Sequence, residues 1–267
     1  MTNVAPQEPI SPPRPGVGLP SARTLTVEVW IVMLLSIAAS GIRAFIYLAD
    51  SLTLGVPLKQ QVASIVVSYA PDRPWLDLSY QVVNIGLALV PVALVLYLLY
   101  RSGEGPGVIG IDRTQPLRDL WRGALLAAVL GSAGLVFYLV AFRFGASVQI
   151  QAVNLTGQWW TIPIEVLSAA ENAILEEVIV LAYLLHRLKQ LGWRPGQAIA
   201  ASALLRGAYH LYQGFGGFVG NVVMGSVFGW LYTRWNRVMP FIVAHFIIDA
   251  VAFIGYSALH GKVSWIP

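Results

Sequence analysis

The sequence predicts an all-α fold, a polytopic transmembrane helix bundle with about seven spans. Of its 267 residues, 57% are hydrophobic and only 11% are charged, whereas about a quarter of the residues of a soluble domain carry a charge. Apolar stretches of about 20 residues, which is enough to cross a bilayer, recur along the chain. The expected surroundings are therefore the lipid bilayer of a cell membrane.

The composition also excludes several classes of function. Cysteine is absent, so disulfides, thiol nucleophiles and cysteine-based zinc sites are ruled out. The net charge is +4, but the basic residues form no patch interleaved with aromatic residues, so nucleic acid is not an expected partner.

The spans can be placed in order along the chain. Residues 1–23 contain six prolines and few large apolar side chains, which predicts a disordered tail over residues 1–24 and a transmembrane domain over residues 25–267. The apolar piece at residues 60–70 is too short to span and is expected to be interfacial or re-entrant, which leaves an eight-span alternative open. The seven expected spans cover residues 25–48, 78–100, 120–142, 161–185, 196–213, 216–234 and 239–259.

The basic residues between the spans predict the orientation. Eleven fall on the side of the N-terminus and four on the other side, so the positive-inside rule places the N-terminus in the cytoplasm. The four are Lys59, Arg73, Arg143 and Lys262, and the eleven are Arg14, Arg23, Arg101, Arg113, Arg118, Arg122, Arg187, Lys189, Arg194, Arg234 and Arg237.

Five of the thirteen acidic residues lie inside the fourth and seventh spans. A charge at the centre of a span costs about 2.5 kcal/mol or more, so such residues usually face a polar cavity or a partner. Glu177 projects about 100° away from Glu176, and Glu171 is expected on nearly the opposite side, in a structural role. One stripe of the fourth span, roughly 80° wide, is polar: Glu165, Ser168, Asn172 and Glu176.

Two other spans carry ionisable pairs at helical spacing. Arg206 and His210 are four residues apart in "RGAYH", and His245 and Asp249 are four apart in "HFIID". Each pair therefore shares one face of its helix. The glutamates are tolerable in the fourth span if these groups meet them in one hydrated pocket. The alternative is that each polar residue only joins two helices, as a buried ion pair or hydrogen bond.

The motifs "EEVIVLAYL", "RGAYH" and "HFIID" resemble those of the CPBP family of intramembrane metalloproteases, the Abi-like family that includes the CAAX prenyl endopeptidases and the bacteriocin-processing proteins. That family is marked by Glu-Glu-x-x-x-Arg on one helix, Phe-x-x-x-His on a second and His-x-x-x-Asn or His-x-x-x-Asp on a third. The order and rough spacing match over about residues 160–258. The first three spans resemble the family only in being hydrophobic.

The resemblance implies site residues and a reaction. Glu176 and Glu177 take the double-glutamate positions, the first activating the attacking water, and the histidines and Asp249 hold that water, a metal or the developing oxyanion. The site residues implied are Glu176, Glu177, His210, His245 and Asp249. The chain departs from the family at two positions, where Leu181 replaces the arginine and Arg206 replaces the phenylalanine. We therefore expect Arg206 to supply the cation from the neighbouring helix.

A metal is a second expectation. Glu176, Glu177 and Asp249 bring three negative charges and Arg206 brings one positive charge, so a divalent cation such as zinc would balance the site. Protonation of two groups would do the same. Two histidines and a carboxylate, here His210, His245 and Glu176, form a ligand set that zinc accepts. No HExxH signature is present.

The expected function is an intramembrane endopeptidase that hydrolyses a peptide or membrane-protein substrate with a glutamate-activated water, which a metal could bind. Two alternatives stay open. The missing family arginine favours a non-catalytic relative that binds or scaffolds another membrane protein. Glutamate, histidine and aspartate inside a membrane also make proton relays, as in a proton-coupled transporter.

Overall fold

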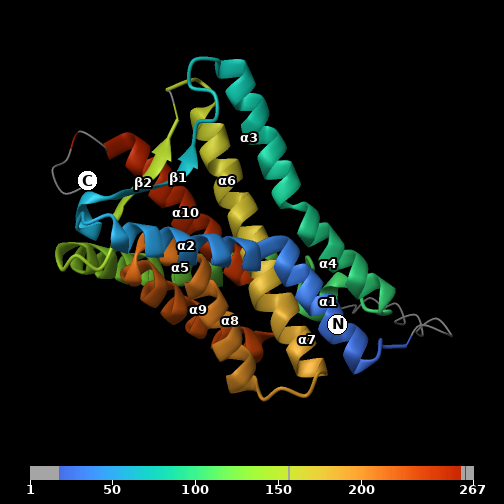
Figure 1. Ribbon diagram of the computed structural model, residues 1–267. Helices are drawn as coiled ribbons and strands as arrows, with labels where there is room; N and C mark the ends of the chain where they lie inside the picture. Colours follow the sequence, from blue (N-terminus) through green and yellow to red (C-terminus); the bar gives the residue numbers. More distant parts are fainter. Residues whose placement is uncertain (1–17, 156, 260–261, 263–267) are drawn as a thin grey trace.

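The computed structural model describes residues 18–155, 157–259 and 262, which form a helix bundle with one small sheet (Figure 1). The expected tail lies mostly outside these residues. The helices are α1 Ala22–Met33, α2 Ala39–Thr53, α3 Pro74–Ala88, α4 Val90–Arg101, α5 Pro116–Arg143, α6 Thr161–Glu176, α7 Leu184–Gln190, α8 Pro195–Tyr209, α9 Phe215–Trp235 and α10 Met239–Leu259, and the strands are β1 Val62–Val67 and β2 Gln149–Asn154.

Short helical segments of other types join these elements. Two are π-helical and join the α-helices on either side without a loop. The other three are short 3₁₀ segments in loops. They are η1 Leu34–Ala38 and η4 Glu177–Tyr183, and η2 Leu58–Gln60, η3 Pro106–Ile109 and η5 Leu211–Gln213.

The all-α membrane fold is confirmed, apart from the sheet. Five helical stretches are long and apolar enough to cross a bilayer, and they correspond to the first, second, third, sixth and seventh expected spans. They are Ala22–Thr53, Pro74–Arg101, Pro116–Arg143, Phe215–Trp235 and Met239–Leu259.

The other two expected spans are helical but unusual. The fourth is a continuous helix from Thr161 to Gln190, made of α6, η4 and α7, and it carries four glutamates. The fifth is α8, whose 15 residues extend over about 22 Å, less than the roughly 30 Å of a hydrocarbon core. Its last residue, Tyr209, is buried and contacts Glu176 of the central helix, so the C-terminal end of α8 lies beside that helix.

The segment at residues 60–70 does not form a helix, so the eight-span alternative is wrong. It contains β1, which pairs in parallel with β2 from the loop between α5 and α6. Both strands have six residues, and VASIVV is a short apolar run that periodicity alone cannot assign to a strand or a helix. Val66 and Val153 of the sheet pack against Ala169 of α6 and Phe253 of α10.

The central helix lies in the middle of the apolar core. All seven residues of η4 are buried, and five of them pack in one cluster with Val95 of α4 and Phe241 of α10. α10 packs against both α5 and α6, and α8 packs against α9. In Figure 1, α3 and α4 run along one side of α6, and the sheet lies near the first turn of α6.

At the end of the bundle away from the sheet, ion pairs connect the loops between the helices. Arg237, between α9 and α10, contacts Asp112 at 2.8 Å and Asp119 at 2.6 Å. Arg187 of α7 contacts Glu104 at 2.7 Å. Hydrogen bonds from Thr114, followed by Arg237, lower the pKa of Asp112 to about 2. These loops lie on the side that the sequence assigns to the cytoplasm, which stays a prediction.

The crossing of α5 and α10 can be tested with a pair of glycines in α5. A Cβ at Gly123 would lie 2.5 Å from Val243 Cγ1 and 2.8 Å from the Pro240 carbonyl, whereas a Cβ at Gly134 would meet no atom within 4 Å. Gly123→Ala is expected to lower the unfolding free energy by about 1–3 kcal/mol through overpacking. Gly134→Ala should be neutral. Equal thermal unfolding midpoints in detergent would contradict this packing.

Candidate active site

Glu176 and Glu177 lie at the point where the central helix changes its geometry. Glu176 ends α6 and Glu177 begins η4, and their exposed fractions are 4% and 0%. π-helical turns inside α-helices are frequent at functional sites. Ser202 of α8 donates its hydroxyl to the Val180 carbonyl of η4 at 2.7 Å. The neighbouring helix thus satisfies a backbone group of the widened turn.

Arg206 of α8 contacts both glutamates. Its Nη2 donates to Glu177 Oε1, and its Nη1 lies 3.6 Å from Glu176 Oε2. Tyr209 donates its hydroxyl to the same Glu176 oxygen at 2.7 Å. Arg206 is only 1% exposed, so its charge depends on these carboxylates for compensation. The cation that the sequence analysis expects from the neighbouring helix is in contact with the glutamate pair.

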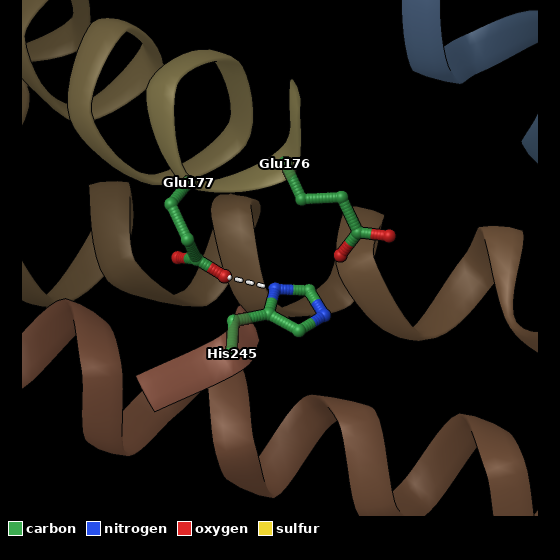
Figure 2. Close-up of side chains that lie close together, drawn as sticks. All are labelled: Glu176, Glu177 and His245. Atoms are coloured by element: carbon green, nitrogen blue, oxygen red, sulfur yellow. Dashed lines mark hydrogen bonds and ion pairs between the residues drawn. The ribbon is translucent and has the colours of Figure 1, made fainter. Parts of the chain in front are cut away.

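His245 of α10 lies beside the glutamates (Figure 2). Its Nδ1–H donates to Glu177 Oε1 at 2.8 Å, because a carboxylate can only accept. Its Nε2 lies 3.4 Å from Asp249 Oδ2. Asn172 of α6 donates to that Asp249 oxygen at 2.7 Å. The pair on α10 is therefore joined to the central helix at two points.

His210 belongs to the same region but has a different environment. Its Nδ1–H donates to the Arg206 carbonyl at 2.9 Å, so the neutral ring presents Nε2 as an acceptor. The ring lies next to Tyr209 and Tyr212, with centroids 4.7 Å and 6.2 Å away. The described residues fix the ring but leave Nε2 available to a ligand or a water.

A cleft of about 360 Å³ opens onto this cluster. Glu176 and His210 both line it, whereas Glu177 and His245 do not. Its other walls come from η1, α2, β1 and α3, including Ser40, Ile65 and Asn84. The cluster thus has a part that faces the cleft and a part buried behind it.

Three of these side chains are close enough to hold a metal ion. Glu176, Glu177 and His245 each offer a ligand atom, and these atoms lie within 4.8 Å of one another. Two carboxylates and an imidazole form a donor set that zinc accepts. The residues therefore fit a divalent metal. His210, which the sequence analysis includes in the ligand set, is not a member of this group.

Side-chain contacts join five of the six predicted site residues, and His210, which is hydrogen-bonded to the Arg206 carbonyl, lines the same cleft as Glu176. Two other acidic residues differ from expectation. Glu171 lines the cleft beside Asn172, so the prediction that it faces away was wrong; α3 and β1 extend the cleft beyond the polar stripe. Glu165 lies outside the cleft and accepts a hydrogen bond from Ser257 of α10 at 2.6 Å.

Sequence reasoning missed one polar contact of the site. Tyr209 contacts Glu176 directly, but in the sequence it is one of several aromatic residues near a helix end. Its spacing could have predicted the contact, because Tyr209 lies three residues after Arg206 and both side chains therefore share one face of α8.

Arg206→Leu is expected to destabilise the protein strongly. Removal of one partner of a buried ion pair costs about 3–5 kcal/mol, because the other charges stay buried without compensation. The measurement is the thermal unfolding midpoint of the protein in detergent or in vesicles.

Arg234→Leu is the matched control, since Arg234 is exposed, forms no ion pair with a described residue and lies over the Trp230 ring, 4.3 Å from its centroid. It should unfold close to the wild-type temperature. If Arg206→Leu were as stable as Arg234→Leu, the ion pair with Glu177 would not hold α8 to the central helix.

Comparison with known families supports the expected resemblance. Residues 157–251 match the family model described as Type II CAAX prenyl endopeptidase Rce1-like. No curated protein and no solved structure matches the chain significantly. The matched segment contains the whole cluster, from the glutamates of the central helix to Asp249 of α10. The resemblance of this part of the chain to the Rce1-like type II CAAX prenyl endopeptidases, a family of membrane proteases, is therefore confirmed.

Proposed function

We propose that the chain is an intramembrane endopeptidase that cuts a peptide or membrane-protein substrate with a water activated by Glu176. The observation that carries this proposal is that Glu176 lines a cleft while charged groups behind it are fully buried. A group placed for stability alone would not need to face a cleft. The match to a family of membrane proteases covers the same residues and supports a peptidase function.

Glu176 is suited to act as the base. Tyr209 and Arg206 contact its Oε2, and no described residue donates a hydrogen bond to Oε1. Amide hydrolysis requires a base within reach of the attacking water. Glu176 Oε1 would take one proton from this water while the water oxygen attacks the carbonyl carbon. The same proton would then pass to the amine that leaves.

His210 is suited to position that water. Its Nδ1–H is committed to the Arg206 carbonyl, so Nε2 of the neutral ring can accept a hydrogen bond from water. In the protonated ring, Nε2–H would instead donate to the oxyanion of the tetrahedral intermediate. Both roles require that His210 faces the cleft, as it does.

The buried residues keep the carboxylates ionised and in place. Arg206 contacts both glutamates, and a nearby cation favours the charged form of a carboxylate. His245 and Asp249 continue this chain of contacts from α10. Without Arg206, desolvation would favour protonated glutamates, which could not accept a proton from water.

A divalent metal such as zinc is compatible with this proposal. Glu176, Glu177 and His245 are the residues that would hold it. When bound, it would supply a Lewis acid and balance the excess negative charge of the cluster.

Glu176→Gln is expected to abolish proteolysis in a folded protein, because the change keeps the size of the side chain and removes the base. Loss of a general base lowers the rate by about 10²- to 10⁴-fold. The measurement is fragment release from peptides and membrane-protein reporters in reconstituted vesicles, with a prenylated CAAX peptide as the first probe.

Glu165→Gln is the control, because it makes the same change in the same helix outside the cleft. It should retain activity. Full turnover by well-folded Glu176→Gln would reject Glu176 as the base. Substrate-dependent proton flux without fragment release would favour a transporter, and binding without either would favour a scaffold.

Removal of all metal by chelation is expected to abolish proteolysis by the wild-type protein, and added zinc or another divalent ion should restore this activity. The reason is the group of two carboxylates and one imidazole, whose ligand atoms lie within 4.8 Å of one another. The measurement is fragment release before and after metal is returned, with metal content followed in parallel. Activity that persists in metal-free protein would leave a mechanism with only Glu176, His210 and Arg206.

A further inference from the structure

β1 has an open edge. In the part of the chain that the structure describes, the sheet contains only β1 and β2, so each strand has one edge without a strand partner. The Gln61 carbonyl accepts from Gln149 of β2, and successive carbonyls of a strand point to opposite edges. The Val62 carbonyl therefore points away from β2, and so do the N–H and C=O groups of Ser64.

Side chains of the flanking helices confirm the direction of this edge. Tyr47 of α2 donates its hydroxyl to the Val62 carbonyl at 3.3 Å, and Gln81 of α3 donates to the Val67 carbonyl at 2.8 Å. The Val67 carbonyl lies on this edge because the alternation shifts by one residue where Ile65 is unpaired. The Ser68 N–H accordingly faces β2 and donates to the Asn154 carbonyl. The open edge thus faces the space between α2 and α3. Ser64 lies between these two contacts, and no side chain of the described residues hydrogen-bonds to its backbone groups.

The open edge borders the candidate active site. Ile65, Val66 and Val67 of β1 line the cleft that also contains Glu176 and His210. Ala63 and Ser64 line a second cavity of about 340 Å³ beside Arg43. The two cavities share three lining residues: Ser40, Tyr209 and Tyr212. β1 therefore runs along two neighbouring cavities, one of which contains the glutamate.

The ladder of β1 is interrupted next to the cleft. Ile65 has no partner residue in β2, whereas the residues on both sides of it are paired. Ile65 is also exposed, at 37%. Ala152 of β2 is unpaired at the same point, so the two strands separate there without a change of register.

We propose that this edge of β1 binds the substrate, as an extended peptide segment that adds to the sheet as a third strand. The inference rests on the proposed peptidase function and specifies the conformation of the substrate. A peptide bond inside a helix is shielded, so the substrate must unwind near the bond that is cut. Unwound backbone inside a membrane needs hydrogen-bond partners, and an open strand edge supplies them.

The chain offers a direct test because it contains no cysteine. Ser64→Cys in the Glu176→Gln protein gives a single thiol at the edge, and substrate peptides carry one cysteine at successive positions. Side chains of a strand alternate between its two faces. Disulfide formation in vesicles should therefore be strong at every second peptide position. Ile65→Cys provides a second probe if Ser64→Cys folds poorly.

Val219→Cys is the control, since Val219 of α9 is 44% exposed and lines neither cavity. It should form no specific disulfide. Efficient disulfides at every third or fourth peptide position would indicate a bound helix and overturn the proposal. Equal yields at all positions, or none at any position of a peptide that the wild type cleaves, would overturn it as well.

A second measurement tests the backbone contacts themselves. An ester in place of one substrate amide removes a single N–H donor, which should raise KM roughly 2- to 10-fold where that N–H faces β1. At alternate positions KM should be unchanged, and kcat should be unchanged throughout. An effect without alternation would reject strand addition. Absence of any cleavage by the wild type would instead reject the peptidase function, while the disulfide pattern would still report on β1.

Discussion

The contact of Arg206 with the two glutamates is the constraint on which the rest of the bundle depends. A buried guanidinium is tolerable only with carboxylates at close range, so α8 must lie directly against the central helix. α9 leaves room for it, since a Cβ at Gly225 would lie 3.2 Å from Arg206 Cδ and 3.1 Å from the Ala203 backbone. The Phe228 ring lies 5.7 Å from the guanidinium carbon. The positions of three helices thus follow from one ion pair.

The short length of α8 and the π-helical turn serve the same arrangement. Because α8 ends at Tyr209, the hydroxyl of that residue contacts Glu176 from the helix end, and His210, the next residue, lines the same cleft. A full-length span would carry this end past the glutamates. The π turn that starts at Glu177 is stabilised from the same helix through Ser202. Both irregular features therefore lie where the cleft meets the buried charges.

The sequence predicts the parts of the site that depend on spacing within one helix. Pairs four residues apart, such as His245 and Asp249, must share a helix face whatever the packing. Contacts between helices are harder to predict from the sequence. The role of Tyr209 depends on where α8 ends, and the position of Glu171 at the cleft depends on how far α3 and β1 extend the cleft. The two strands were missed because a six-residue strand gains its stability from its partner, which lies almost 90 residues away in the chain.

The adjacency of Glu176 and Glu177 has a geometric reason. Neighbouring residues of a helix point about 100° apart, so two consecutive carboxylates can serve two different surroundings. Glu176 turns to the cleft and contacts Tyr209, whereas Glu177 turns into the interior and contacts Arg206 and His245. Glutamates one turn apart would both face the cleft, and the arginine would then lose its buried partner. Two adjacent acids let one helix hold the cation in the core and present a base to the substrate.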